Sequence, residues 1–267
     1  MGNGAPRRPT LAKRGRFDLA DDGTIPDDEV DIALRSPSAA AARTIVLGTV
    51  CRRAFIEDRP GEFGDDGPDA ARFDLLAWLL AEGLGGAISP SERHLLTAHA
   101  GALEPDQAAA ASWATEALVA IGWALGLLDP IPGYECPADP APLLMLLPAP
   151  WDGTIAFCQS SSLRAEDAVA FERERAELWD WRAGVAESID SASPAARRDA
   201  AMAIRDVAHE GHAAGLLPAP IGDDFPLGDR AFGDRSAETI GTVGSIARER
   251  LRALDWLCGL TDTWDPP

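Results

Sequence analysis

Four charged side chains fall inside the apolar faces of predicted helices, where a lone charge is costly to bury. Residues three, four and seven apart share one face of a helix. By this spacing Glu116 lies between two tryptophans, Arg250 is the one charge on an apolar face of the last predicted helix, and Arg43 and Glu174 occupy similar positions in two others. Because an isolated buried ion is strongly unfavourable even after relaxation, we expect these four residues to form an internal ion-pair network.

Two interpretations of such a network remain open at this point. Arginine suits it because its planar fork binds a carboxylate through two hydrogen bonds. The network could serve only to fix the register of the helices. It could instead line a pocket with tryptophan walls, since perturbed charges beside aromatic rings in a cleft are typical of binding sites. The candidate binding residues are Arg43, Trp113, Glu116, Trp123, Glu174, Trp181 and Arg250.

Other residues with reactive side chains do not form a recognisable catalytic motif. His209 and His212 are three residues apart, whereas the helical zinc motif HExxH needs a spacing of four for both imidazoles to converge. The serines at 160–162 are best placed to cap the following helix, and Asp223 and Asp224 lack the alternating oxygen ligands of a calcium loop. We therefore predict no catalytic residue, no metal ligand and no cofactor, and leave enzymatic activity uncertain.

The elements that must position the charged residues are helices. Cap residues, prolines and glycines delimit predicted helices over 37–57, 70–81, 90–100, 105–128, 164–189, 194–214 and 236–259. The stretch Pro105–Leu128 becomes apolar on every side from Ala117, which is typical of a helix enclosed by other elements. The apolar run within it is too short to cross a bilayer, so no membrane span is predicted.

The fold class that follows is mainly α: a single-domain irregular helical bundle around a central buried helix. Residues 1–27 are rich in glycine, proline and charge and are predicted to be a disordered tail, with the domain over 28–260 and a frayed C-terminus over 261–267. The short apolar pieces at 143–147 and 154–158 are compatible with single turns or with strands.

Composition restricts the partners of the protein. The net charge of -19 argues against nucleic acid, which needs clustered cations, and is compatible with a basic protein partner. Four scattered cysteines without a CxxC pair, and no apolar signal region after the basic N-terminus, favour reduced thiols and a cytoplasmic location.

Four stretches together resemble one bacterial family, catalogued as domain of unknown function 4272. They are LRSPSAAAARTIVLG at 34–48, WATEALVAIGWALGLL at 113–128, DDFPLGDRAF at 223–232 and SIARERLRALDWLCG at 245–259. The resemblance covers residues 28–259 and implies recurring positions at Arg43, Trp113, Glu116, Trp123, Glu249, Arg250 and Trp256. The closing stretch departs from the family pattern at Leu251 and Asp255, where His and Asn are expected. No activity follows from the resemblance.

The leading expectation is a non-catalytic acidic protein that binds a protein partner, as an accessory or immunity-type protein does. The alternative is an enzyme or small-molecule binder that uses a pocket around Glu116 and Arg250. A third, purely structural interpretation treats the buried charges as fixing helix register only.

Overall fold

The computed structural model of the protein describes residues 32–63, 67–189 and 191–265. The chain divides into two compact units, which are treated separately: a larger unit of residues 32–170 and 249–267, and a smaller unit whose described part lies within 171–248. The predicted tail over 1–27 lies outside the described residues. The assignment of one domain stays a prediction.

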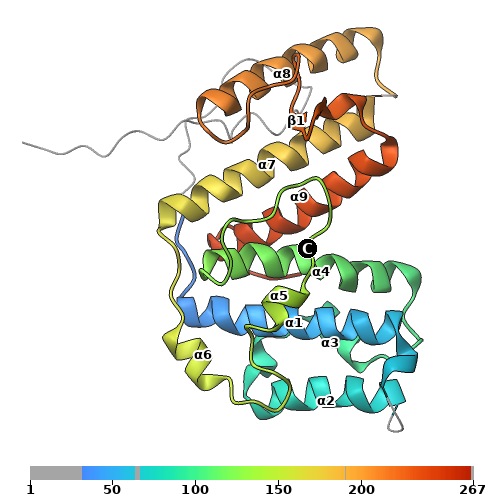
Figure 1. Ribbon diagram of the computed structural model, residues 1–267, viewed down its shortest axis with the longest axis vertical. Helices are drawn as coiled ribbons and strands as arrows, with labels where there is room; N and C mark the ends of the chain where they lie inside the picture. Colours follow the sequence, from blue (N-terminus) through green and yellow to red (C-terminus); the bar gives the residue numbers. More distant parts are fainter. Residues whose placement is uncertain (1–31, 64–66, 190, 266–267) are drawn as a thin grey trace, which may run out of the picture. The chain divides into compact units, whose positions relative to one another are not determined.

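In the described part of the larger unit, the regular secondary structure is helical (Figure 1). This unit contains α1 (Pro37–Asp58), η2 (Pro60–Glu62), α2 (Gly67–Ala81), η3 (Leu84–Ala87), α3 (Pro90–Thr97), α4 (Pro105–Ala124), α5 (Ala141–Leu144), α6 (Ile155–Ser160), the first turn of α7 (Glu166–Ile189) and the end of α9 (Ala237–Leu257). Helix α1 packs along α4 and also contacts α2, α3 and α6.

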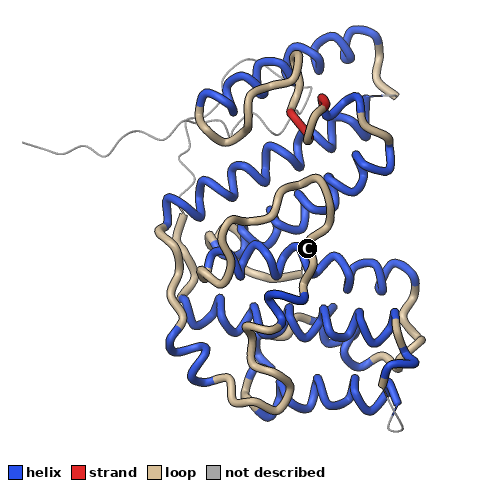
Figure 2. The backbone as a smooth tube through the Cα atoms, viewed as in Figure 1, coloured by secondary structure: helices blue, strands red, loops and turns tan. Residues whose placement is uncertain are grey.

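The smaller unit contains the rest of α7, α8 (Pro194–Ala213), a two-residue hairpin and the start of α9. The hairpin pairs β1 (Pro226–Leu227) with β2 (Arg230–Ala231) in antiparallel register and is followed by η4 (Phe232–Asp234). It is the one sheet in the described part of the chain, as Figure 2 shows. The mainly α class predicted from the sequence is therefore confirmed.

Local signals explain where the helices begin and end. The side chain of Ser36 caps α1, and Ser89 and Glu92 form a reciprocal capping box at the start of α3. The central helix α4 ends at Ala124 and not at the predicted Leu128. Gly126 adopts a left-handed conformation there (φ 73°), and the N–H of Leu127 turns back to the carbonyl of Gly122, which stops the helix.

Burial agrees with the predicted faces in two helices. Every residue of α4 from Ala114 to Ala124 is buried, as expected for a helix apolar on all sides, and the predicted face of α9 around Arg250 is buried throughout. The pieces left open between turns and strands are the short helices α5 and α6. Among the helices of the described ranges, none combines the length and hydropathy that a bilayer span requires.

Candidate functional site

Glu116 and Arg250 form a fully buried ion pair in the core of the larger unit. The Nε and Nη2 atoms of Arg250 both donate to Oε2 of Glu116, at 2.9 and 2.8 Å, and neither side chain is measurably exposed. The other carboxylate oxygen, Oε1, accepts the N–H of Ala138 at 2.7 Å. The ion pair predicted between these two residues is confirmed.

The same arginine holds the loop that follows α4. Its Nη1 donates to the carbonyl of Pro132 at 2.6 Å, its Nη2 also reaches the carbonyl of Gly133 at 3.1 Å, and its guanidinium lies over the ring of Tyr134. Every nitrogen of Arg250 is thus bonded, and so are both oxygens of Glu116. This arrangement fixes α4, α9 and the loop over 132–138 to one another and leaves no free polar group for a ligand.

Arg43 pairs with Glu92 and not with Glu116, so the single four-residue network predicted from the helix faces is wrong for this residue. Its Nη2 donates to Oε2 of Glu92 at 2.5 Å, and both side chains are buried. The same carboxylate oxygen accepts the N–H of Ser89, completing the capping box of α3. Glu92 therefore carries both the helix cap and the buried ion pair.

The Arg43–Glu92 pair is incompletely bonded, unlike the Glu116–Arg250 pair. Arg43 is only 2% exposed, yet its Nε has no hydrogen-bond acceptor among the described residues, and Oε1 of Glu92 has no donor there. Burial lowers the pKa of Arg43 from its ordinary value, although Glu92 opposes this change. A buried donor without an acceptor is unusual in a folded protein.

Two indole rings and two further guanidinium groups surround this arginine. Arg43 and Arg252 both lie over the ring of Trp264, with their Cζ atoms 4.3 and 4.4 Å from its centroid. Trp264 meets Trp256 edge to face at 5.5 Å, and Arg35 lies over Trp256 at 4.7 Å. Such cation–π contacts hold each guanidinium at a fixed place on its ring.

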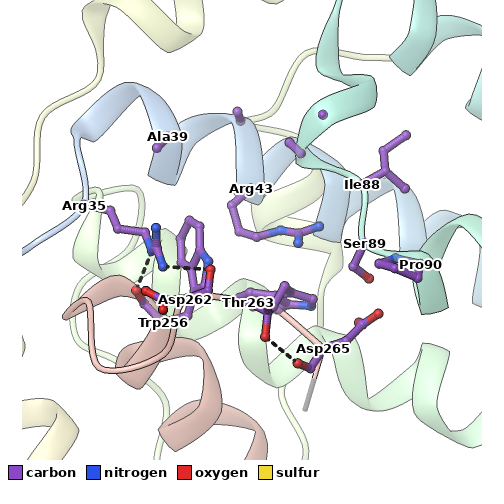
Figure 3. A pocket seen from close by; sticks show the side chains of 14 residues that line it. Arg35, Ala39, Arg43, Ile88, Ser89, Pro90, Trp256, Asp262, Thr263 and Asp265 are labelled. Atoms are coloured by element: carbon purple, nitrogen blue, oxygen red, sulfur yellow. Dashed lines mark hydrogen bonds between the residues drawn. The ribbon is translucent and has the colours of Figure 1, made fainter. Parts of the chain in front are cut away.

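Arg43 lines a pocket of about 680 Å³ in the larger unit (Figure 3). One wall is Arg35 with the start of α1, a second is the connection from η3 to α3 with Ser89, and a third is the end of α9 with Trp256 and the segment after it with Asp265. This volume lies within the usual range for small-molecule sites. Glu116 and Arg250 do not line this pocket.

The C-terminal wall of the pocket is held in place by Asp265. Its carboxylate accepts the N–H of Ser91 at 2.9 Å and the hydroxyl of Ser91 at 2.5 Å, at the start of α3. Trp264 is buried. The sequence predicts a frayed end for residues 261–267, but Trp264 and Asp265 are instead packed and hydrogen-bonded, because an acidic side chain at a helix N-terminus satisfies free N–H groups.

The remaining predicted site residues are not among those that line this pocket. Trp113 is half-buried on α4, and Trp123 is buried with Arg164 over its ring at 4.9 Å. Glu174 and Trp181 belong to the smaller unit, and both are half-buried.

In α7 the buried face is not the predicted one. Glu172 and Arg182 are buried where the sequence pattern selects Glu174 and Trp181. Arg182 donates from Nε and Nη2 to the two oxygens of Asp224, both at 2.7 Å, so the segment before the hairpin supplies its partner. Helix α7 carries charges on all sides, and its apolar positions alone do not define the buried face.

A second surface feature of the larger unit is a run of exposed apolar side chains. Within the segment 145–155, Met145 is 84% exposed, Ile155 is 66% exposed, and Leu146 and Trp151 are also exposed. Trp151 has a φ of 72°, in the left-handed region that favours glycine, and the N–H of Asp152 bonds back to the carbonyl of Ala149 around it. We call this run the 145–155 surface.

No group of three or more potential metal ligands is found within the described ranges. Cys51 and Cys258 are buried, and Cys136 is exposed; none of the four cysteines is in a disulfide bond. Burial raises the pKa of the Cys51 thiol to about 11, against a smaller lowering by its contact with Thr115. This thiol is a packed hydrophobe and not a nucleophile.

Comparison with known proteins gives one match. No curated protein matches the chain, and no solved structure does. Residues 8–209 match the model of a family described as "Domain of unknown function (DUF4272)". Of the four stretches that resemble this family, those at 34–48 and 113–128 lie inside the matched residues, and those at 223–232 and 245–259 lie beyond them. The chain belongs to the DUF4272 family, as its sequence pattern predicts.

Proposed function

We propose that this protein is a non-catalytic binding protein whose partner is another protein, in the manner of an accessory or immunity protein. The observation that carries the proposal is Trp151 on the 145–155 surface. A bulky residue in the left-handed region costs roughly 1–2 kcal/mol relative to glycine, and its indole is nevertheless exposed to solvent. Strain of this kind is retained where a side chain serves a function.

The neighbouring side chains extend this apolar surface. Met145, Leu146 and Ile155 are exposed close to Trp151 in the chain, and solvent-facing clusters of large apolar residues are typical of protein interfaces. Tryptophan and methionine are both enriched at such interfaces. Hydrogen bonds to α2 and to Glu82, which follows it, hold this segment in place. The indole N–H of Trp78 donates to the carbonyl of Asp152, and Thr154 donates to the carboxylate of Glu82.

The charge of the chain indicates the chemistry of the partner. A net charge of -19 repels acidic proteins and accelerates association with basic ones. The partner we propose is a basic protein that presents an apolar patch to the 145–155 surface.

The alternative of an enzyme or small-molecule binder centred on Glu116 and Arg250 has less support. Both side chains are buried, and their polar atoms are all bonded within the protein.

The test compares the unchanged protein with the variants W151G and F73A in affinity capture from cells that make the protein, followed by calorimetric titration of any purified partner. W151G removes the indole and relieves the left-handed strain, so loss of binding cannot be attributed to unfolding. F73A is the matched control, since Phe73 is an equally exposed aromatic residue on α2. The proposal expects a basic protein that binds the unchanged protein and F73A and not W151G. Equal binding by W151G contradicts it, and so does self-association that W151G abolishes in sedimentation velocity experiments.

A further inference from the structure

The guanidinium of Arg43, which lines the pocket, has N–H groups that make no hydrogen bond to the described residues. A guanidinium carries five N–H groups, and Arg43 uses one of them, towards Glu92, among the described residues. The side chain is nevertheless buried and lines the pocket. The Nε donor is shielded from solvent, so the donors that a ligand in the pocket can reach are those of Nη1, which makes no hydrogen bond to the described residues. A ligand that supplies acceptors to Nη1 gains affinity from a group already in place.

The charge of the walls restricts the acceptor to a monoanion. Asp262 and Asp265 line the same pocket and offset the charges of Arg35 and Arg43, and Glu92 lies behind Arg43 with one oxygen unbonded. A phosphate group carries a charge near -2 at neutral pH, and these carboxylates would repel it. A carboxylate carries one charge and offers two oxygens to a guanidinium.

The rest of the pocket suits an apolar body. Its remaining walls include the indole of Trp256 and the side chains of Ala39, Ala42 and Ile88. The volume of about 680 Å³ is far larger than a simple inorganic anion needs. Arg35 is held beside Trp256 by the carbonyls of Trp256, Thr261 and Asp262, so the rim of the pocket is already ordered.

We propose that this pocket binds a small organic acid with one carboxylate, which Arg43 receives, and a flat, largely apolar body, which packs against Trp256 and the start of α1. The site is separate from the 145–155 surface, and the inference does not depend on the protein-binding function proposed above.

The experiment measures binding of benzoate and indole-3-acetate to the whole protein by calorimetry and by tryptophan fluorescence. Benzamide and indole-3-acetamide serve as matched neutral compounds, and acetate and inorganic phosphate as anions without the apolar body. We expect at least one aromatic carboxylate to bind, and to bind at least about tenfold more tightly than its amide, the ratio that 1.4 kcal/mol provides. Equal binding of acid and amide, or binding of phosphate as tight as that of the best acid, overturns the proposal. Absence of binding by both acids at millimolar concentration overturns it as well.

Two variants locate the site. A39L fills the pocket from the surface of α1 without touching a hydrogen bond and is expected to lower affinity at least about tenfold. A109L, an exposed alanine on α4 outside the pocket, is its matched control and keeps full affinity. R43K retains a positive charge opposite Glu92 and removes the planar fork, so it is expected to weaken the acid and leave the amide unchanged. Binding by A39L equal to that by A109L overturns the assignment to this pocket.

Discussion

Arg250 directs two nitrogen atoms at one carboxylate oxygen of Glu116, a residue 134 positions earlier in the chain. The pair joins the central helix to the last helix, and the arginine also binds the carbonyls of Pro132 and Gly133. Because both residues are buried and fully bonded, the structural interpretation of these two charges explains their geometry without a ligand. Their removal should therefore be visible in stability.

Replacing Glu116 with glutamine should lower the free energy of unfolding by about 3 kcal/mol or more, because breaking one side of a buried ion pair leaves the other charge uncompensated. Denaturation by urea, followed by circular dichroism, measures the change. Glu135 is an exposed glutamate in the loop after α4, and E135Q should remain within about 0.5 kcal/mol of the unchanged protein. A similar small effect for E116Q would show that the pair contributes little.

The smaller unit offers a test on two adjacent residues. Asp224 accepts hydrogen bonds from Nε and Nη2 of the buried Arg182 and from the backbone N–H groups of Phe225 and Gly233. Its neighbour Asp223 is exposed. D224N should destabilise the protein by about 3 kcal/mol, and D223N should have little effect. Urea denaturation of the two variants side by side distinguishes the buried contact from the general loss of one negative charge. Equal stability of the two variants would contradict this assignment.

Stability should fall in alkaline solution because of Cys51. Its pKa is about 11 in the folded protein and 9.0 for an unperturbed thiol. Between these values the unfolded chain loses the proton while the folded protein keeps it, so the free energy of unfolding falls as pH rises, by at most about 1.4 kcal/mol per unit. Denaturation curves between pH 8 and 11 measure the slope. The variant C51A should have a flatter profile, and an unchanged slope in C51A would assign the effect to other groups.

W151G should keep the stability of the unchanged protein within about 1 kcal/mol. Glycine accepts the left-handed backbone at position 151 without strain, which offsets the greater freedom that glycine gives the unfolded chain. Thermal denaturation of W151G and W151A separates the relief of backbone strain from the loss of the indole, because W151A lacks the indole and retains the strained backbone. W151A should be the less stable of the two, and the reverse order would show that φ at this position carries no strain.

Helix periodicity predicted the elements and part of the buried charge pattern. The face of α9 has a single charge among apolar residues, so Arg250 could be identified from spacing alone. Helix α7 alternates acidic and basic residues over 172–175, and there the spacing selected Glu174, which is half-buried, and missed the buried Glu172. A periodic pattern identifies the buried face of a helix only where that face is otherwise free of polar residues.

The pocket could not be predicted in the same way. Glu92 carries the signature of a helix cap, and nothing in that local pattern indicates its second bond to Arg43. Trp264 and Asp265 follow the last helix, in a short segment without periodicity. Two of their partners, Arg43 and Ser91, are distant in sequence, so only tertiary structure brings them together. A buried-type residue such as tryptophan near the end of a polar segment was the one available signal.

The hydrogen bonds from Ser91 to Asp265 join residues that are 174 positions apart. During synthesis on the ribosome, α1 and α3 can pack long before this contact forms, because a chain folds from its N-terminus as it is made. The pocket at Arg43 gains its third wall only when Trp264 and Asp265 have emerged. Affinity for an organic acid would thus distinguish chains that include Trp264 and Asp265 from those that stop after α9.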